Sequence, residues 1–167
     1  DPFEKGSEFF NFIKNSGDTY IYPAVKHGIS WDVHSNKPIE KAADVPKQIL
    51  EGVDTSKPNL LERRKHWNEP APSEAGLPTE IWREVMERRH RYDELQQTIK
   101  KGGIAHINDC ITYNLNISQI VVDWLSNTPD PKAIKCFYEA LTKVSVLDPT
   151  CGSGAFLFAA LNLLEQL

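Results

Sequence analysis

The chain has 167 residues, of which 40% are hydrophobic and 25% are charged, a composition typical of a globular protein rather than a disordered one. Its 19 Lys and Arg against 23 Asp and Glu give a net charge of −4, which argues against a strongly basic nucleic-acid-binding fold. The sequence has no uninterrupted apolar run of the roughly 18 residues that a membrane-spanning helix needs, so we expect a cytoplasmic protein without membrane contact.

Residues 1–78 are predicted to form an irregular lead-in region. The first residue is not Met and no signal peptide is recognisable, so we interpret the sequence as the interior of a longer chain. Apolar residues between Phe9 and Ile13 predict a short helix, and the aromatic and β-branched residues of 19–25 predict a short strand. Prolines then recur as far as Pro78, which indicates a long connection that wraps over a surface.

Residues 79–142 are predicted to be a helical region. Its first helix should begin at Thr79, which is suited to cap it, and should end at Gly102 and Gly103. The apolar stripe of this helix comprises Ile81, Val85, Tyr92, Leu95 and Ile99, with Arg88 in its one gap.

Two further helices are predicted before residue 143. The second has Asn108 as its N-cap and an apolar face that comprises Ile111, Leu115, Ile120, Val121, Val122, Trp124 and Leu125. The third begins at Asp130 with Pro131 in its first turn, where proline is tolerated. Its predicted buried stripe comprises Ile134, Phe137, Tyr138 and Leu141.

Two clusters of basic residues and three cysteines can be explained without a functional site. Basic residues gather at 63–66 and at 88–91, and a solvated helix surface is favoured for them over contact with DNA. Cys110, Cys136 and Cys151 are odd in number and form no Cys-x-x-Cys pair, which argues against a disulfide framework and against a zinc site. No metal site is predicted. We expect reduced thiols, as in cytoplasmic proteins.

Residues 143–167 change in character. A short β-type run at 144–147 ends at Asp148, a glycine-containing turn follows, and residues 155–167 predict a helix that is apolar almost all round. Such a helix packs on a sheet inside a larger protein. One strand cannot form a sheet, so we expect further residues outside this sequence to complete an α/β domain. The fold class predicted for these 167 residues themselves is mainly α with one β-strand.

The strand, glycine turn and helix resemble a ligand-binding loop. Gly152 and Gly154 permit a sharp turn and close approach of a ligand. The free N–H groups at a helix start favour a carboxylate, and Asp148 can accept hydrogen bonds from an amine. An amino-acid moiety such as that of S-adenosylmethionine satisfies both. A phosphate-binding loop would need a Lys that is absent, the dinucleotide fingerprint Gly-x-Gly-x-x-Gly lacks its third glycine, and Cys151 has no evident histidine partner as a nucleophile.

The string Asp-Pro-Thr-Cys-Gly-Ser-Gly-Ala-Phe at 148–156 resembles motif I of the adenine-N6 DNA methyltransferases of restriction-modification and phage-defence systems. Within these, the chain is similar to the PglX (BREX) and Eco57I-like group. The upstream segments that carry this second resemblance are residues 19–28, 67–72, 77–85 and 107–115.

The resemblance implies a Rossmann-like class I methyltransferase as the parent protein, with S-adenosyl-L-methionine as cofactor and double-stranded DNA as substrate. Other subunits of a defence system are further expected partners. It implies that Asp148, Gly152 and Gly154 line the methionine end of the cofactor. It also implies that the rest of the loop shapes the pocket, namely Pro149, Thr150, Cys151, Ser153 and Phe156, although Phe156 is equally suited to pack against a sheet. The helix that carries Tyr113, Asn114 and Ile117 is expected to approach motif I.

The catalytic motif of this family, Asn/Asp-Pro-Pro-Tyr/Phe, positions the flipped adenine. The chain contains no Pro-Pro dipeptide, so these 167 residues alone are predicted to be inactive, with no catalytic residue among them. Two alternatives stay open from the sequence. One is a methyltransferase of the same superfamily that acts on RNA or protein, and the other is a helical interaction module with an incidental glycine loop.

Overall fold

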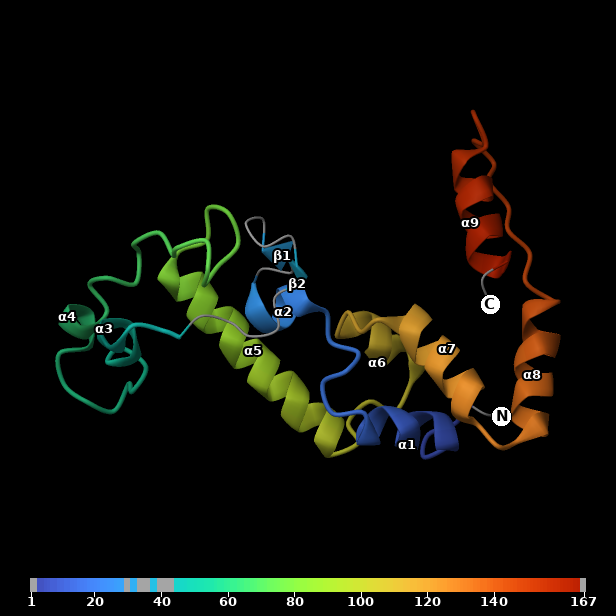
Figure 1. Ribbon diagram of the computed structural model, residues 1–167, viewed down its shortest axis with the longest axis horizontal. Coiled ribbons are helices and arrows are strands. Elements are labelled where there is room, and N and C mark those ends of the chain that lie inside the picture. The colour runs from blue at the N-terminus through green and yellow to red at the C-terminus, as the bar shows by residue number, and fades with distance from the viewer. Residues whose placement is uncertain (1–2, 29–30, 33–36, 39–43, 166–167) are drawn as a thin grey trace.

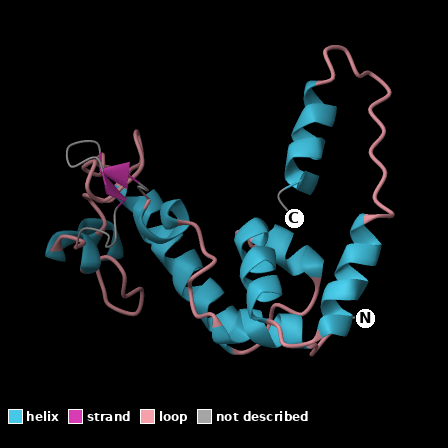
Figure 2. Cartoon of the chain, turned by 45° about the vertical axis from the view of Figure 1, so that its right-hand side comes forward, coloured by secondary structure: helices cyan, strands magenta, loops and turns pink. Residues whose placement is uncertain are grey.

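The computed structural model describes residues 3–28, 31–32, 37–38 and 44–165, and this part of the chain is mostly helical (Figures 1 and 2). The helices are α1 (Glu8–Asn15), α2 (Pro23–His27), α3 (Lys47–Leu50), α4 (Leu60–Arg63), α5 (Trp82–Lys100), α6 (Ile107–Thr112), α7 (Ile117–Asn127), α8 (Pro131–Leu141) and α9 (Ala155–Glu165). The mainly α prediction is therefore confirmed. No described helix combines the length and the apolar character needed to cross a bilayer.

The strands lie elsewhere than the sequence suggested. The strands of the described residues are β1 (Trp31–Asp32) and β2 (Lys37–Pro38), which pair antiparallel with Trp31 opposite Pro38. The predicted strand at 19–25 is wrong, because residues 16–20 form turns and α2 begins at Pro23. Proline at the first helical position suits a helix start, and Ile21 alone forms a bridge, with Leu115.

A first hydrophobic core joins α1, α5 and α7. The predicted helix at 9–13 is confirmed as α1, and its Phe9, Phe10 and Ile13 are almost fully buried. The Phe9 ring meets the Trp124 ring edge to face, with 5.3 Å between centroids. The buried aromatic and aliphatic side chains of helices distant in sequence thus form one continuous cluster.

Two tyrosines tie the segment before α2 to this core. The hydroxyl of Tyr20 donates to Asp123 Oδ2 of α7 at 3.0 Å, and the hydroxyl of Tyr92 of α5 donates to Asp18 Oδ2 at 2.7 Å. Lys26 also lies 3.2 Å from Asp18 Oδ2. These polar contacts fix the segment's path across the helices.

Helix α5 has the predicted stripe but a different start. Thr79 adopts a positive φ of 70° and does not cap the helix. Instead, Ile81 is the N-cap residue, and its N–H donates to Glu84 Oε2 at 3.0 Å. The Glu84 carboxylate in the first turn caps the helix in place of Thr79, because it can accept a hydrogen bond from a backbone N–H at the helix start. The helix ends before Gly102, which has a φ of 72°.

A second, smaller core supports the N-terminal end of α5. It contains the buried side chains of Ile49, Trp67, Ala75, Trp82 and Val85. Arg88 interrupts the apolar stripe of α5 and lies beside this core. Its buried guanidinium forms an ion pair with Glu80. The basic cluster at 88–91 is therefore only partly a solvated surface.

The predicted second helix is two helices. The helix is interrupted between α6 and α7, where Asn114 adopts a left-handed φ of 50°. Asn tolerates this conformation better than most residues. The N-cap of α6 is His106, not Asn108, and the N–H of His106 donates to Asp109 Oδ2 at 2.9 Å. Asn116 caps α7 by accepting from the Gln119 N–H at 3.2 Å.

Helix α8 begins as predicted, yet its apolar stripe is not a core. Asp130 caps the helix by accepting from the Lys132 N–H at 2.9 Å. Ala133 is the residue of α8 that is buried, whereas Ile134 is 43% and Tyr138 66% exposed. The predicted burial is wrong for Ile134 and Tyr138, whereas Phe137 and Leu141 are half-buried and the Phe137 ring lies 6.3 Å from the Phe3 ring.

Candidate functional site

The glycine loop follows α8 in an extended segment and leads into α9 (Figure 1). The predicted strand at 144–147 does not form within the described residues, because this segment pairs with no described strand. The predicted helix after the loop is confirmed as α9. Its apolar side chains are exposed, among them Phe156 at 79% and Phe158 at 66%.

Asp148 is the acidic residue of the loop, and its two carboxylate oxygens differ. Oδ1 accepts a hydrogen bond from the Thr150 N–H at 3.0 Å and one from the Thr150 hydroxyl at 3.3 Å. Oδ2 is shielded from solvent and has no hydrogen-bond partner within the described residues. A carboxylate fixed in this way presents one oxygen that a cationic donor would satisfy.

Gly152 and Gly154 give the loop its shape. Both have left-handed backbones, with φ of 48° and 76°, a region in which residues with a side chain are strained. A Cβ at Gly152 would lie 3.7 Å from the Thr150 carbonyl oxygen, and one at Gly154 would lie 3.6 Å from the Phe158 ring. These are ordinary contacts, so the backbone conformation and not crowding requires glycine here.

The remaining loop residues are open to solvent. Pro149, Thr150, Cys151 and Ser153 are exposed, whereas Gly154 is buried and donates its N–H to the Cys151 carbonyl at 2.7 Å. Phe156 is exposed, and both of its predicted roles stay predictions. The three cysteines are free thiols.

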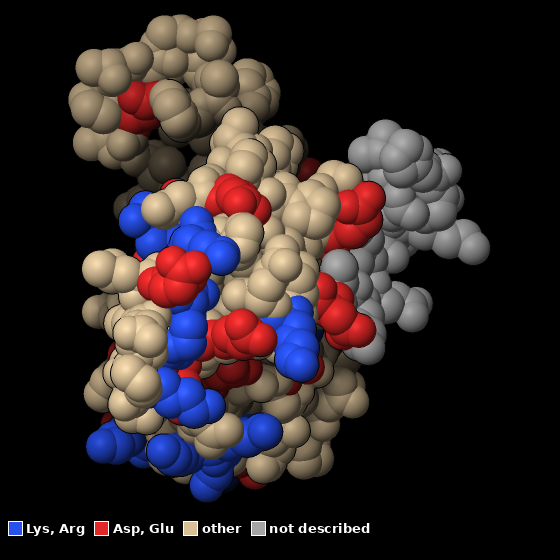
Figure 3. Space-filling view, turned by 90° about the vertical axis from the view of Figure 1, so that its left-hand side faces the viewer, with Lys and Arg blue, Asp and Glu red and all other residues tan. Residues whose placement is uncertain are grey.

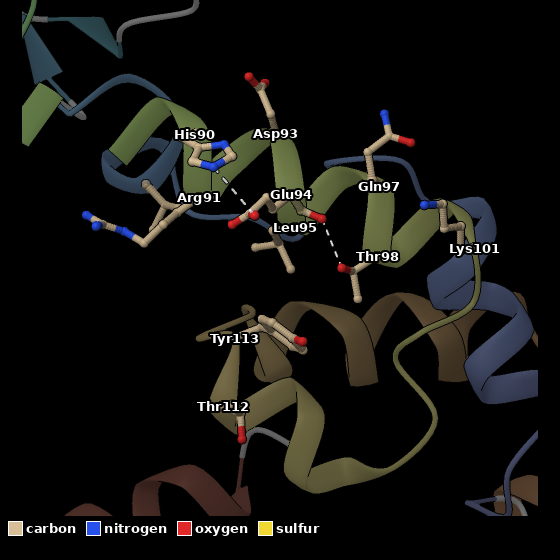
Figure 4. Close-up of a pocket in the computed structure, with 11 residues that line it drawn as sticks. His90, Arg91, Asp93, Glu94, Leu95, Gln97, Thr98, Lys101, Thr112 and Tyr113 are labelled. Carbon is tan, nitrogen blue, oxygen red and sulfur yellow. Dashed lines mark hydrogen bonds and ion pairs between the residues drawn. The ribbon is translucent and has the colours of Figure 1, made fainter. Parts of the chain in front are cut away.

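The turn between α6 and α7 does not lie at the glycine loop. In Figures 1 and 2, the loop is at the end of α9 that points away from α6 and α7. Tyr113 instead lines a cleft of about 790 Å³ between α5 and the end of α6. Figure 4 shows Leu95 and Thr98 of α5 pointing toward Tyr113 across this cleft. The expected approach of Tyr113, Asn114 and Ile117 to motif I is therefore not seen in this part of the chain.

Sequence reasoning missed this cleft, although a signal for it exists. Polar residues recur along one side of α5 at helical spacing, from His90 and Glu94 to Thr98 and Lys101. His90 lies 3.6 Å from Glu94, and the Thr98 hydroxyl donates to the Glu94 carbonyl at 2.9 Å, so much of the polar character is satisfied within the helix (Figure 4).

The glycine loop can therefore offer a carboxylate acceptor and a backbone turn, but no ready metal site. Within the described residues, no three His, Cys, Asp or Glu side chains gather as metal ligands would. No family model, no curated protein and no solved structure matches the chain.

Proposed function

We propose that the chain carries the methionine-binding part of the S-adenosylmethionine site of a DNA adenine-N6 methyltransferase from a restriction-modification or phage-defence system. The string at 148–156 resembles motif I of that family. The parent enzyme would have a Rossmann-like α/β domain, to which the segment at 144–147, the glycine loop and α9 would contribute a strand, a turn and a helix.

The free carboxylate oxygen of Asp148 is the observation that carries this proposal. Oδ1 is held by Thr150, and Oδ2 has no partner in the described chain. The cofactor's methionine moiety has an ammonium group, which would supply the missing donor. Its carboxylate would meet the N–H groups at the start of α9, which lack acceptors within the helix.

The other loop residues have supporting roles in this proposal. Gly152 and Gly154 hold the turn by their left-handed backbones, so that main-chain atoms approach the ligand without an intervening side chain. When bound, the cofactor supplies an activated methyl group. Residues that orient adenine are absent from these 167 residues, which contain no Pro-Pro dipeptide, and the chain alone is predicted not to transfer methyl groups.

The test is transfer of a labelled methyl group from S-adenosylmethionine by the full-length polypeptide, with double-stranded DNA, RNA and protein as competing acceptors. We expect label in DNA, as N6-methyladenine identified by mass spectrometry. Label in RNA or protein would identify a methyltransferase of another substrate class. Absence of both cofactor binding and transfer would leave the helical interaction module as the remaining explanation.

Two glycine variants provide a matched comparison in the same assay. Gly154→Ala and Gly17→Ala both place a side chain at a positive φ, of 76° and 66° respectively, with no close contact in either case. Both should therefore strain the backbone similarly. Only Gly154→Ala should reduce transfer, because only Gly154 lies in the loop. Equal effects of the two variants on transfer would contradict the proposed role.

A further inference from the structure

One segment of this acidic chain is locally basic. Residues 57–66, which we call the α4 tip, contain four Lys and Arg against a single Glu, whereas the rest of the chain contains fifteen against twenty-two. The tip lies at the end of the molecule that Figure 3 faces, where Lys and Arg gather along the lower edge. Glu51, Asp54 and Glu69 flank the tip, so the excess of positive charge is confined to these ten residues.

The two arginines of the α4 tip hold its backbone rather than face solvent freely. Arg63 donates to the carbonyls of Pro58 at 3.0 Å and Lys57 at 2.6 Å, and also to the Glu51 carbonyl. Arg64 donates to the Gly52 carbonyl at 2.8 Å. The loop before α4 is thus fixed to the helix by charged donors, which form strong hydrogen bonds.

The α4 tip is also anchored to the second core. The Arg64 guanidinium lies over the Trp67 ring, 4.1 Å from its centroid. The buried indole N–H of Trp67 donates to the Ile49 carbonyl at 2.9 Å. Trp67 and Ile49 belong to the second core, so these contacts fix the tip to that core.

The α4 tip presents one apolar side chain and two lysines. Leu61 is 91% exposed, more than any other large apolar side chain in the described residues. The side chains of Lys57 and Lys65 are 67% and 56% exposed, and each pairs with an exposed carboxylate close in sequence. Exposed ion pairs of this kind are weak, so both lysines can exchange their partners for a stronger one.

We propose that the α4 tip contacts double-stranded DNA, with Lys57 and Lys65 on phosphates and Leu61 as a wedge against the base pairs. Lysines position a protein on the backbone, and apolar side chains inserted in the minor groove unstack base steps. The choice of DNA as partner rests on the proposed function. A lipid surface fits less well, since a membrane-bound segment presents an extended apolar face rather than a single leucine.

The lysines are tested by the salt dependence of DNA binding to the full-length polypeptide. Replacing Lys57 and Lys65 together by Glu should weaken binding and reduce the slope of log affinity against log salt by about two, one for each lost phosphate contact. The matched control is Lys135→Glu, since Lys135 is also exposed and paired, with Glu139 of α8. An unchanged slope in the double variant, or no DNA binding by the wild type, overturns the proposal.

The wedge is tested with duplexes that carry the fluorescent base 2-aminopurine, whose emission rises on unstacking. Leu61→Ala should abolish the rise that the wild type produces, and Ile134→Ala, at an exposed position of α8, should retain it. A full rise with Leu61→Ala, or preferential binding of the wild type to anionic phospholipid vesicles, overturns the proposal. Cofactor binding measured on the same samples separates the two ideas: these effects without cofactor binding contradict only the proposed cofactor site.

Discussion

At the residue scale, Arg88 and Glu80 form an ion pair in which Arg88 is buried and the Glu80 side chain is 11% exposed. Arg88 Nε and Nη2 each donate to a carboxylate oxygen of Glu80 at 3.1 Å, and Nη2 also donates to the Ala75 carbonyl. Burial alone would raise the pKa of Glu80, but the hydrogen bonds from Arg88 and from the Leu77 N–H, together with the Arg88 charge, lower it below its ordinary value. The carboxylate is therefore charged at neutral pH, and its contribution to stability is lost only as the pH falls through this lowered value.

Removing either partner of this pair should destabilise the protein strongly. Arg88→Met or Glu80→Gln should each lower the free energy of unfolding by about 3–5 kcal/mol, because each leaves a buried charge without its counterpart. The double variant should lose less than the sum of the two. Urea denaturation measures all three.

An exposed ion pair provides the control for these three variants. Lys135 and Glu139 of α8 lie 3.8 Å apart in solvent, and their single variants should change the free energy of unfolding by less than about 1 kcal/mol. If the Arg88 variants were as mild as these, the second core would not depend on the buried pair.

Tyr20 and Tyr92 should titrate late. Burial and the hydrogen bond to Asp123 raise the pKa of Tyr20 to about 12, and burial and the hydrogen bond to Asp18 raise that of Tyr92 to about 12. Raised values in the folded state mean that the stabilisation is complete below about pH 10 and is lost as the pH rises toward 12.

Ultraviolet absorbance of tyrosinate measures this directly. We expect two of the five tyrosines to ionise near pH 12, and Tyr20→Phe and Tyr92→Phe should each remove one of these late steps. A wild-type curve in which all five ionise together near pH 10 would show that the segment before α2 is not fixed by these hydroxyls.

At the element scale, the N-cap of α8 determines whether that helix is stable. Helix α8 has few buried side chains, so packing contributes little and the cap contributes more. Asp130→Ala should lower the free energy of unfolding by about 1 kcal/mol and speed amide exchange in the first turn, because the Lys132 N–H loses its acceptor. Asp130→Ser retains an acceptor and should behave as the wild type. Equal exchange in Ala and Ser variants would mean that the cap is unimportant.

The sequence could predict those elements that are determined by residues within their own segment. The helices α1, α5, α8 and α9 follow from apolar spacing and capping residues within each segment. The break at Asn114 and the turns before Pro23 were missed because long-range contacts stabilise them, such as the Asn116 N–H donating to the Tyr20 carbonyl at 2.9 Å. A left-handed backbone at a non-glycine residue has no reliable sequence signal.

At the scale of the whole molecule, apolar patterning predicted more burial than the described residues supply. The segment at 144–147 was predicted as a strand because of its β-branched residues, yet a strand needs a neighbour to pair with. Several apolar side chains of α8 and α9 were likewise predicted to be buried but are exposed. Periodicity identifies the apolar face of a helix but not the element that covers it. The glycine turn was predictable because its positive φ angles are a local property of Gly152 and Gly154.

Asp54 provides a matched comparison for the proposed hydrogen bond between Asp148 and the amino group of S-adenosylmethionine. Asp54 forms the same kind of turn as Asp148, with its Oδ1 accepting from the Ser56 N–H at 3.0 Å and from the Ser56 hydroxyl, but it precedes no glycine loop. Asn at either position keeps an oxygen for the turn and loses the negative charge. A hydrogen bond to a charged group contributes about 1.5–3 kcal/mol, which corresponds to roughly tenfold to a hundredfold in affinity.

The most direct measurement is calorimetric titration of the full-length polypeptide with S-adenosylmethionine, for the wild type, Asp148→Asn and Asp54→Asn. We predict that the wild type and Asp54→Asn bind alike and that Asp148→Asn binds about tenfold or more weakly. Wild-type affinity in Asp148→Asn, or no binding by any of the three proteins, would contradict the account.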